Sequence, residues 1–356
     1  MLYAASTMHV LVTGGAGYIG STLVPMLLEL GHEVTVLDRF YFGPESLAAA
    51  RKAFENKLHL VRQDVRYVEE KVFEGVDAMV DLAGISNDPA CELDEKLTLD
   101  TNLESCDRLA RMAAKAGVKR IVFASSCSVY GHGASTELTE KSELHPVSLY
   151  AKCKAQAEKR LWKLADEKGD DMTIVALRFA TVFGLAPRMR FDLAVNIMSK
   201  NAYVDRRITV EGGGRQWRPF VHVKDIGRAI LTGLEQPHEK VHKKVFNVGS
   251  NDNNLRIITL AYRIRDLVPG TEIVLAPTDP DRRDYNVRFD HITAELGYEA
   301  AYSIDDGVRE VVEALRTGAI DASDRRWYTL KQYVFLTEVE RTYANIALDG
   351  HVLSST

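Results

Sequence analysis

The sequence predicts an α/β protein built on a doubly wound parallel sheet, with a smaller second domain toward the C-terminus. Three observations support this prediction. Short apolar runs alternate with longer helix-like stretches through the first half of the chain, as in repeated strand–helix units. A glycine-rich turn separates the first apolar run from the first helix-like stretch. The second half loses this alternation and carries short polar segments rich in Arg, Asp and Asn.

The elements follow from these patterns in order. Short continuous apolar runs are typical of strands buried on both faces, and they occur at residues 10–12, 34–37, 58–61, 78–82, 120–124 and 173–177. Helices are expected at residues 21–30, 103–116, 149–168 and 304–316. We expect the sheet domain at residues 8–180 with returns near 221–250, the smaller domain at 181–330, and a C-terminal extension at 331–356.

The turn after the first strand carries a glycine at every third position. Gly14, Gly17 and Gly20 have this spacing, and Tyr18 and Ile19 lie between the last two. Glycine allows a tight turn and a close backbone approach to a pyrophosphate, which rests on the N-terminus of the following helix. This turn therefore predicts a dinucleotide site.

An acidic residue at the end of the second predicted strand indicates which dinucleotide binds. Asp38 follows the glycines by about twenty residues, the distance at which an acid accepts hydrogen bonds from the adenosine ribose. A carboxylate there repels a 2′-phosphate, so we expect NAD rather than NADP. Arg39 comes next, and its positive charge weakens the preference for NAD over NADP.

Tyr150 and Lys154 are four residues apart at the start of a predicted helix, so their side chains share one face. A phenol titrates near 10 and is a poor base at neutral pH. A nearby ammonium favours the phenolate, so we expect Lys154 to lower the pKa of Tyr150. Tyr150 would then exchange a proton with a sugar hydroxyl or ketone.

Composition agrees with a soluble cytoplasmic enzyme. Of 356 residues, 46% are hydrophobic, which is enough for a large core, and the net charge of −5 leaves no nucleic-acid footprint. No apolar run is long enough to span a bilayer, and residues 1–8 do not resemble a signal peptide. The four cysteines have neither metal-site spacing nor a disulfide pattern, so no metal is expected.

Taken together, these motifs resemble the extended short-chain dehydrogenase/reductase family, which includes nucleotide-sugar epimerases and dehydratases such as the UDP-glucose 4-epimerases. The resemblance covers roughly residues 8–316 and includes the segments 64–66, 82–84, 125–131, 218–225 and 282–285. It implies a Rossmann-like NAD-binding domain and a smaller C-terminal substrate-binding domain. Besides the turn and Asp38, the cofactor residues implied by it are Asp64, Val65, Leu82, Ala83, Gly84, Asn102, Tyr150 and Lys154.

The resemblance also implies a catalytic set. Ser126 matches the family's catalytic Ser/Thr and would act together with Tyr150 and Lys154. The 4,6-dehydratases carry Asp-Glu directly after that Ser/Thr, whereas this chain has Cys127 and Ser128. Water elimination is therefore not expected. Cys127 has two interpretations, a buried filler or an acid beside the site.

The substrate side resembles a receptor for a nucleotide diphosphate. Arginine suits a pyrophosphate because its planar fork donates two hydrogen bonds at once. A sugar carboxylate is the alternative ligand for Arg188 or Arg190, whose segment resembles a subgroup that includes C4 dehydrogenases of nucleotide-linked heptoses. The expected substrate residues are Ser86, Ser128, Thr181, Arg188, Arg190, Asn196, Arg218 and Arg283.

The leading hypothesis is an NAD-dependent epimerase that oxidises the C4 hydroxyl of a nucleotide-linked sugar and reduces the ketone again. A C4 dehydrogenase or ketoreductase, a UDP-glucuronate decarboxylase and a non-catalytic NAD-binding regulator remain as alternatives. The helices at 103–116 and 149–168 are similar to those through which the family dimerises, so a homodimer is expected. An apolar stripe of Leu103, Leu109, Met112 and Ala113 serves either a partner or the chain's own sheet.

Overall fold

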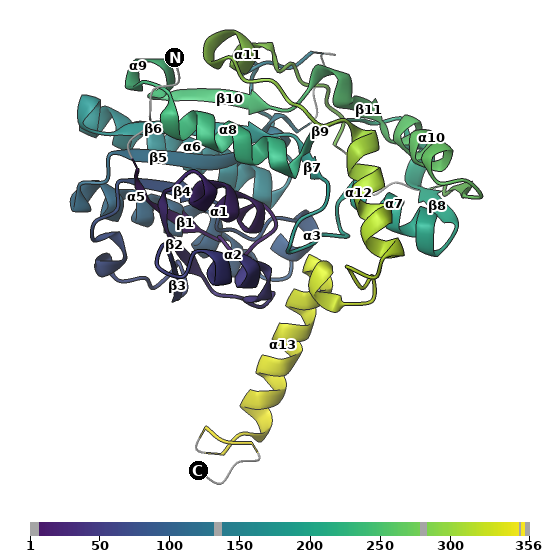
Figure 1. Ribbon diagram of the computed structural model, residues 1–356, viewed down its shortest axis with the longest axis horizontal. Coiled ribbons are helices and arrows are strands. Elements are labelled where there is room, and N and C mark those ends of the chain that lie inside the picture. Colours follow the sequence, from purple (N-terminus) through teal and green to yellow (C-terminus); the bar gives the residue numbers. More distant parts are fainter. Residues whose placement is uncertain (1–6, 132–136, 278–282, 349, 353–356) are drawn as a thin grey trace.

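A seven-stranded, wholly parallel sheet forms the centre of the molecule, which confirms the predicted fold class (Figure 1). The computed structural model describes residues 7–131, 137–277, 283–348 and 350–352. All six predicted strands are present, and the sheet gains a seventh from the second half. The spatial order is β10 (Lys244–Val248), β6 (Thr173–Phe179), β5 (Arg120–Ser126), β4 (Ala78–Asp81), β1 (His9–Thr13), β2 (Glu33–Asp38) and β3 (Leu58–Arg62).

Successive residues of β1 show why its apolar run is continuous. Val10 and Val12 belong to one apolar cluster and Leu11 to another, because neighbouring side chains of a strand point to opposite faces. Helices cover both faces and leave β1 without exposed side chains in its centre. The first cluster packs beneath α1 (Gly20–Glu29) and α8 (Val223–Glu235), and the second beneath α5 (Ser105–Ala116) and α6 (Leu149–Lys168).

The ends of α5 and α6 are set by local sequence. The Ser148 side chain accepts a hydrogen bond from the Ala151 N–H and caps the start of α6. Gly117 ends α5 with a φ of 86°. The predicted helix at 103–116 begins as a π-helical turn, Asp100–Glu104, which carries Asn102 and Leu103 into the interior.

The second half forms a separate group of small elements. It contains a three-stranded sheet of order β11 (Asn254–Arg256), β9 (Trp217–His222), β7 (Thr181–Phe183), and a pair, β12 (Glu272–Leu275) with β8 (Arg207–Val210). Around them pack α7 (Ala194–Val204), α10 (Ile257–Leu267) and α12 (Ile304–Arg316), which share an apolar cluster of their own. The remaining helices include α2 (Ala48–Ala53), α3 (Asp88–Cys91), α4 (Glu95–Leu99), α9 (His238–Val241) and α11 (Asp290–Leu296).

The C-terminal extension is mostly helical. Its helix α13 (Thr329–Ile346) starts against the body and then projects away from it (Figure 1). No helix in the described ranges combines the length and the apolar character that crossing a bilayer requires.

A buried polar network joins the sheet to α6. Arg178 on β6 donates two hydrogen bonds to Glu158 on α6, at 2.9 and 2.7 Å. Both side chains are at most 5% exposed. Arg178 also donates to the Tyr130 hydroxyl, which donates to Asn247 on β10. The network therefore links three elements beneath the site described below.

Removing one partner of this pair should cost far more than removing an exposed partner. We expect Glu158→Gln to lower the free energy of unfolding by about 3–5 kcal/mol, because Arg178 is left buried without its counter-charge. Chemical denaturation measures the change. Glu313→Gln is the matched control, since Glu313 pairs with Arg316 at the surface, and its midpoint should not move. A Glu158→Gln midpoint equal to that of the wild type contradicts the role given to the network.

Candidate active site

The carboxyl ends of β1, β4 and β5 lie side by side and carry most of the predicted site. The turn after β1 is packed so tightly that glycine is required. A Cβ on Gly14 would lie 2.9 Å from the Ala83 backbone nitrogen, and one on Gly20 would lie 2.5 Å from the Gly15 Cα. Gly17 closes the turn by donating its N–H to the Gly14 carbonyl at 3.0 Å. The turn therefore presents bare backbone at the start of α1, as a pyrophosphate requires.

Asp38 ends β2 directly beside this turn. Its carboxylate accepts hydrogen bonds from the N–H groups of Ala16 and Phe40, at 3.0 and 2.6 Å. Burial raises the pKa of Asp38, and these backbone donors oppose that rise. The position suits the adenosine ribose, as the sequence predicts.

Arg39 does not stand free to bind a 2′-phosphate. It forms an ion pair of 2.8 Å with Asp64, which Arg66 also binds at 2.7 Å. Burial works against ionisation of Asp64, but the hydrogen bonds from Arg66 prevail and its pKa is lowered. Val65 is buried next to it. The Arg39 guanidinium is therefore engaged by a carboxylate beside the end of β2.

Two predicted ligand residues turn out to support the site from inside. The Asn102 amide accepts from the Ile85 N–H and donates to the Ile85 carbonyl, both at 2.8 Å, so it shapes the turn of Leu82, Ala83 and Gly84. Its effect on a cofactor is therefore indirect in this structure.

Asn196, predicted to bind the substrate, is the second. Its side chain is fully buried and donates to the Tyr18 hydroxyl and the Arg190 carbonyl, while its oxygen accepts from the Gly184 N–H. Tyr18 in turn donates to the Gly184 carbonyl at 2.6 Å. One amide hydrogen thus joins Tyr18 of the glycine-rich turn to the second half of the chain, and the other forms a contact within that half.

Ser126, Tyr150 and Lys154 are brought together at the end of β5. Ser126 is the last residue of the strand, and its hydroxyl lies close enough to Tyr150 to lower the pKa of that phenol. The Lys154 ammonium lies 5.8 Å from the centroid of the Tyr150 ring and donates to the Ala124 carbonyl at 2.6 Å. Tyr150 is partly accessible to solvent, whereas Lys154 is buried beneath it.

The prediction that Lys154 lowers the pKa of Tyr150 is wrong for the protein without ligands. Burial raises the pKa of Tyr150 above its ordinary value, and the nearby Asp88 adds to the rise. The Ser126 hydroxyl opposes it. Lys154 is directed at a backbone carbonyl rather than at the phenol oxygen, so desolvation dominates and Tyr150 is protonated at neutral pH.

Asp81 is a functional candidate that the motif analysis missed. It is buried at the end of β4 and accepts a hydrogen bond from the Thr13 hydroxyl at 2.6 Å. The register pairs Asp81 with Phe123, so both side chains leave the same face of the sheet. Lys154 lies on that face, with its ammonium 4.7 Å from the Phe123 ring centroid. Burial lowers the pKa of Lys154, and the charge of Asp81 opposes this. The signal in the sequence that could have identified Asp81 was an acidic residue directly before Leu82.

Arg190 is buried close to the loop after β4. It is paired with Asp192 through two hydrogen bonds, the shorter of 2.6 Å, and donates a third to Ser86 at 3.1 Å. Asn87 donates to the same Asp192 carboxylate. Arg190 holds the pKa of Asp192 at about 2, although burial alone would raise it. The segment after β7 is thereby tied to the loop after β4.

Arg188 lies elsewhere, and the structure does not support its predicted contact with the substrate. Its backbone N–H donates to Ser21 on α1, and its guanidinium stacks on Phe42 with 3.6 Å between the Cζ atom and the ring centroid. It is 2% exposed, and its Nε has no hydrogen-bond partner among the described residues. Burial, with the like charge of Arg190, lowers the pKa of Arg188 to about 9. A buried, unsatisfied guanidinium beside the glycine-rich turn fits the diphosphate of a dinucleotide.

Of the remaining substrate candidates, Arg283 is linked to the surroundings of Tyr150 through Asp88. Arg283 forms an ion pair of 3.1 Å with Asp88, which lies close enough to Tyr150 to influence its pKa. Arg218 donates to the carbonyl of Arg283. Of the two smaller candidates, Ser128 is buried with an unsatisfied hydroxyl, and Thr181 begins β7 with its side chain partly accessible.

Comparisons with known proteins show the family of the chain. The profile of the NAD-dependent epimerase/dehydratase family matches residues 10–249. A UDP-glucose 4-epimerase of Lactobacillus helveticus is 30% identical over 77% of this chain and 87% of its own length. A UDP-glucuronic acid decarboxylase of Xenopus tropicalis is 28% identical over 86% of this chain and 72% of its own length.

Solved structures show the same fold with the cofactor in place. The protein MoeE5, in complex with UDP-glucuronic acid and NAD, is 26% identical and has a TM-score of 0.76. The match covers 87% of this chain and 99% of MoeE5. The glycine turn, Asp38 and the Ser126–Tyr150–Lys154 cluster thus have a common explanation: the chain is an enzyme of the NAD-dependent epimerase/dehydratase family, and its cofactor is NAD.

Proposed function

We propose that this enzyme is an epimerase that inverts C4 of a sugar carried on a nucleoside diphosphate. The observation that carries the proposal is the cluster of Ser126, Tyr150 and Lys154, which lies next to the NAD-binding turn at the carboxyl edge of the sheet. The similarity to a UDP-glucose 4-epimerase supports the same substrate class.

In the proposed reaction Tyr150 takes the proton of the C4 hydroxyl and later returns it to the ketone. The glycine-rich turn and Asp38 would hold NAD, which would supply the hydride acceptor and donor for C4. Ser126 holds the C4 oxygen and Tyr150 in one hydrogen-bonded path, and Lys154 places a positive charge beneath the Tyr150 ring. Inversion follows if the 4-keto sugar rotates within the site, so that the hydride returns to its opposite face.

Residues of the second half are proposed to hold the substrate, in line with a sheet domain at 8–180 and a substrate domain at 181–330. Arg283 pairs with Asp88 near Tyr150, and Arg218 donates to the Arg283 carbonyl. Arg190 reaches Ser86. We assign the nucleotide diphosphate to Arg218 and Arg283, and we assign the sugar to the loop after β4.

The site lacks the acid and base of a dehydratase. Cys127 is 1% exposed and donates to the Arg178 carbonyl, and burial raises the pKa of its thiol. It is therefore a buried filler, the first of its two interpretations. The similarity to a UDP-glucuronic acid decarboxylase favours a second candidate function, in which oxidation at C4 releases the carboxylate of a glucuronate as carbon dioxide.

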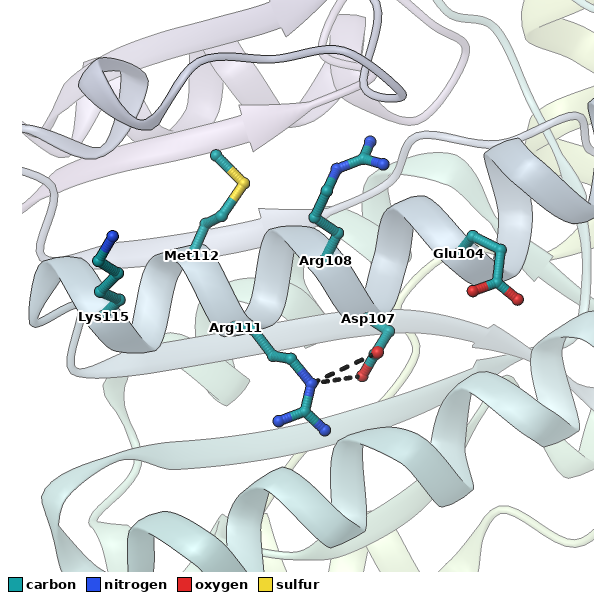
Figure 2. A pocket seen from close by; sticks show the side chains of 6 residues that line it. All are labelled: Glu104, Asp107, Arg108, Arg111, Met112 and Lys115. Carbon is teal, nitrogen blue, oxygen red and sulfur yellow. Dashed lines mark hydrogen bonds and ion pairs between the residues drawn. The ribbon is translucent and has the colours of Figure 1, made fainter.

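We also propose that the enzyme is a cytoplasmic homodimer that pairs through α5 and α6. Of the predicted apolar stripe, Leu103, Leu109 and Ala113 are buried against the chain's own sheet and Met112 partly so. Figure 2 shows that charged side chains of both signs line α5 and the turn before it, namely Glu104, Asp107, Arg108, Arg111 and Lys115. In the proposed dimer this polar surface lies toward the second copy. The molecular mass in solution tests this: a monomeric mass would contradict it.

Product analysis tests the proposed function. Purified enzyme and a panel of nucleotide sugars should give a product of unchanged mass with inverted C4, and no net NADH, measured by mass spectrometry and NMR. Loss of labelled carbon dioxide from UDP-glucuronate would favour the decarboxylase. A product two mass units lighter, formed with stoichiometric NADH, would make the enzyme a dehydrogenase and contradict the epimerase.

Ser126 and Tyr150 should affect the rate in different ways. Tyr150→Phe removes the proton acceptor and should lower kcat by about 10²–10⁴-fold at every pH. Ser126→Ala removes a hydroxyl that lowers the pKa of Tyr150, so the rise of kcat/KM with pH should shift to higher pH. An unshifted profile for Ser126→Ala would count against the shared path.

Asp81 should set the pH at which Lys154 loses its proton. Asp81→Asn removes a charge that keeps Lys154 protonated, so the alkaline decline of activity should begin at lower pH than in the wild type. Asp77→Asn is the control, because Asp77 accepts from the His9 N–H at the opposite end of β1. The hypothesis fails if Asp81→Asn keeps the wild-type alkaline limb.

A further inference from the structure

The base of α13, residues 329–333, contacts the loop that follows β2. Gln332 donates a hydrogen bond to the Tyr41 carbonyl at 2.7 Å. The Tyr333 ring packs edge-on against both Tyr41 and Phe42, with 5.7 Å between centroids in each case. These two aromatic residues come three and four positions after Asp38, so the C-terminal extension lies against the adenosine side of the cofactor site.

The same turn of helix also contacts the loop that follows β4. Leu330 and Tyr333 pack against Ile85, Ala90 and Cys91, in a cluster that also includes Tyr150. In the sheet, β1 lies between β2 and β4. A segment that touches the loops after both neighbours therefore passes over the end of β1, where the glycine-rich turn lies. Figure 1 shows α13 leaving the body from this edge, next to α3.

The tail also holds Arg188 in place. The Thr329 hydroxyl accepts a hydrogen bond of 3.2 Å from the Arg188 guanidinium. Tyr333 lies within electrostatic reach of both Arg188 and Asp38, and burial raises its pKa. Arg188 forms no ion pair with a carboxylate in the described part of the chain, and its Nε is buried without a partner. The tail thus encloses a guanidinium that forms no ion pair within the described residues, next to the turn proposed to receive the diphosphate.

The two halves of α13 differ in the exposure of their side chains. Thr329 and Gln332 at the base are 2% and 5% exposed. All residues from 337 to 346 are exposed. The base of α13 is therefore the part that packs against the body, and it contacts the loops after β2 and β4.

We infer that the base of α13 completes the NAD site as a retaining clamp: Thr329 orients Arg188 on the cofactor's diphosphate, and Gln332 and Tyr333 fasten the loop after β2 over the adenosine. NAD then leaves only when the tail detaches from Tyr41 and Phe42. The inference rests on the NAD-dependent function proposed above and adds a tail beyond residue 316 to the cofactor site. It suits an enzyme whose cofactor is regenerated in every turnover.

Cofactor release, rather than activity, tests the clamp. NAD bound to the purified full-length enzyme is displaced with an excess of 1,N6-etheno-NAD, and the exchange rate is followed by fluorescence. The double variant Gln332→Ala/Tyr333→Ala should exchange at least tenfold faster than the wild type and retain less NAD after purification. Gln332→Ala alone keeps the aromatic packing and should give a smaller increase in the same direction. Val339→Ser, in the exposed half of α13, is the matched control and should exchange at the wild-type rate.

The outcomes separate the clamp from the function on which it rests. Exchange in the folded Gln332→Ala variant and in the double variant within twofold of the wild type overturns the clamp and leaves NAD dependence intact. Wild-type enzyme that binds neither NAD nor its etheno analogue overturns the NAD-dependent function itself. Equal acceleration by Val339→Ser also overturns the clamp, because the effect would then belong to the helix as a whole.

Discussion

The contact between the backbone of the glycine-rich turn and the segment after β4 is the constraint on which the site depends. A side chain at Gly14 would lie 2.9 Å from the Ala83 nitrogen, so these two segments approach as closely as backbones can. The approach is possible because β1 and β4 are hydrogen-bonded neighbours at the place where the strand order reverses. It brings the cofactor turn, the loop that overlooks the sugar and the catalytic end of β5 to one edge of the sheet.

Charges buried at this edge are mostly paired, and the pairs hold loops together. Arg190 with Asp192 ties the second half to the loop after β4, and Arg178 with Glu158 ties β6 to α6. Lys154 has the charge of Asp81 on its own face of the sheet. Arg188 differs, since its guanidinium is stacked on Phe42 and retains an unsatisfied Nε. A site that must receive a diphosphate has a physical reason to leave one cation in that state.

Much of this architecture could be predicted from sequence. Strand positions follow from continuous apolar runs, and the glycine spacing with Asp38 predicts the dinucleotide site, because both depend on local backbone geometry. Spacing also places Tyr150 and Lys154 on one helix face. Spacing does not reveal which polar partner a side chain finds. The interior hydrogen bonds of Asn196 and Asn102, both expected to bind ligands, could therefore not be predicted. The pKa of Tyr150 was predicted in the wrong direction because burial is a tertiary property. Asp81 and the tail belong to no recognised motif, and their roles emerge only from contacts across the fold.

Tracing the C4 hydrogen is the most direct test of the central claim, that Tyr150 and NAD oxidise C4 and return the same hydride. The enzyme would be incubated with a nucleotide sugar that carries deuterium at C4, and the product examined by NMR and mass spectrometry. The account predicts a C4 epimer that keeps its deuterium at C4, because the hydride never leaves the site. A C4 epimer whose deuterium has been replaced by solvent hydrogen would contradict it, because inversion would then proceed by proton exchange at carbon.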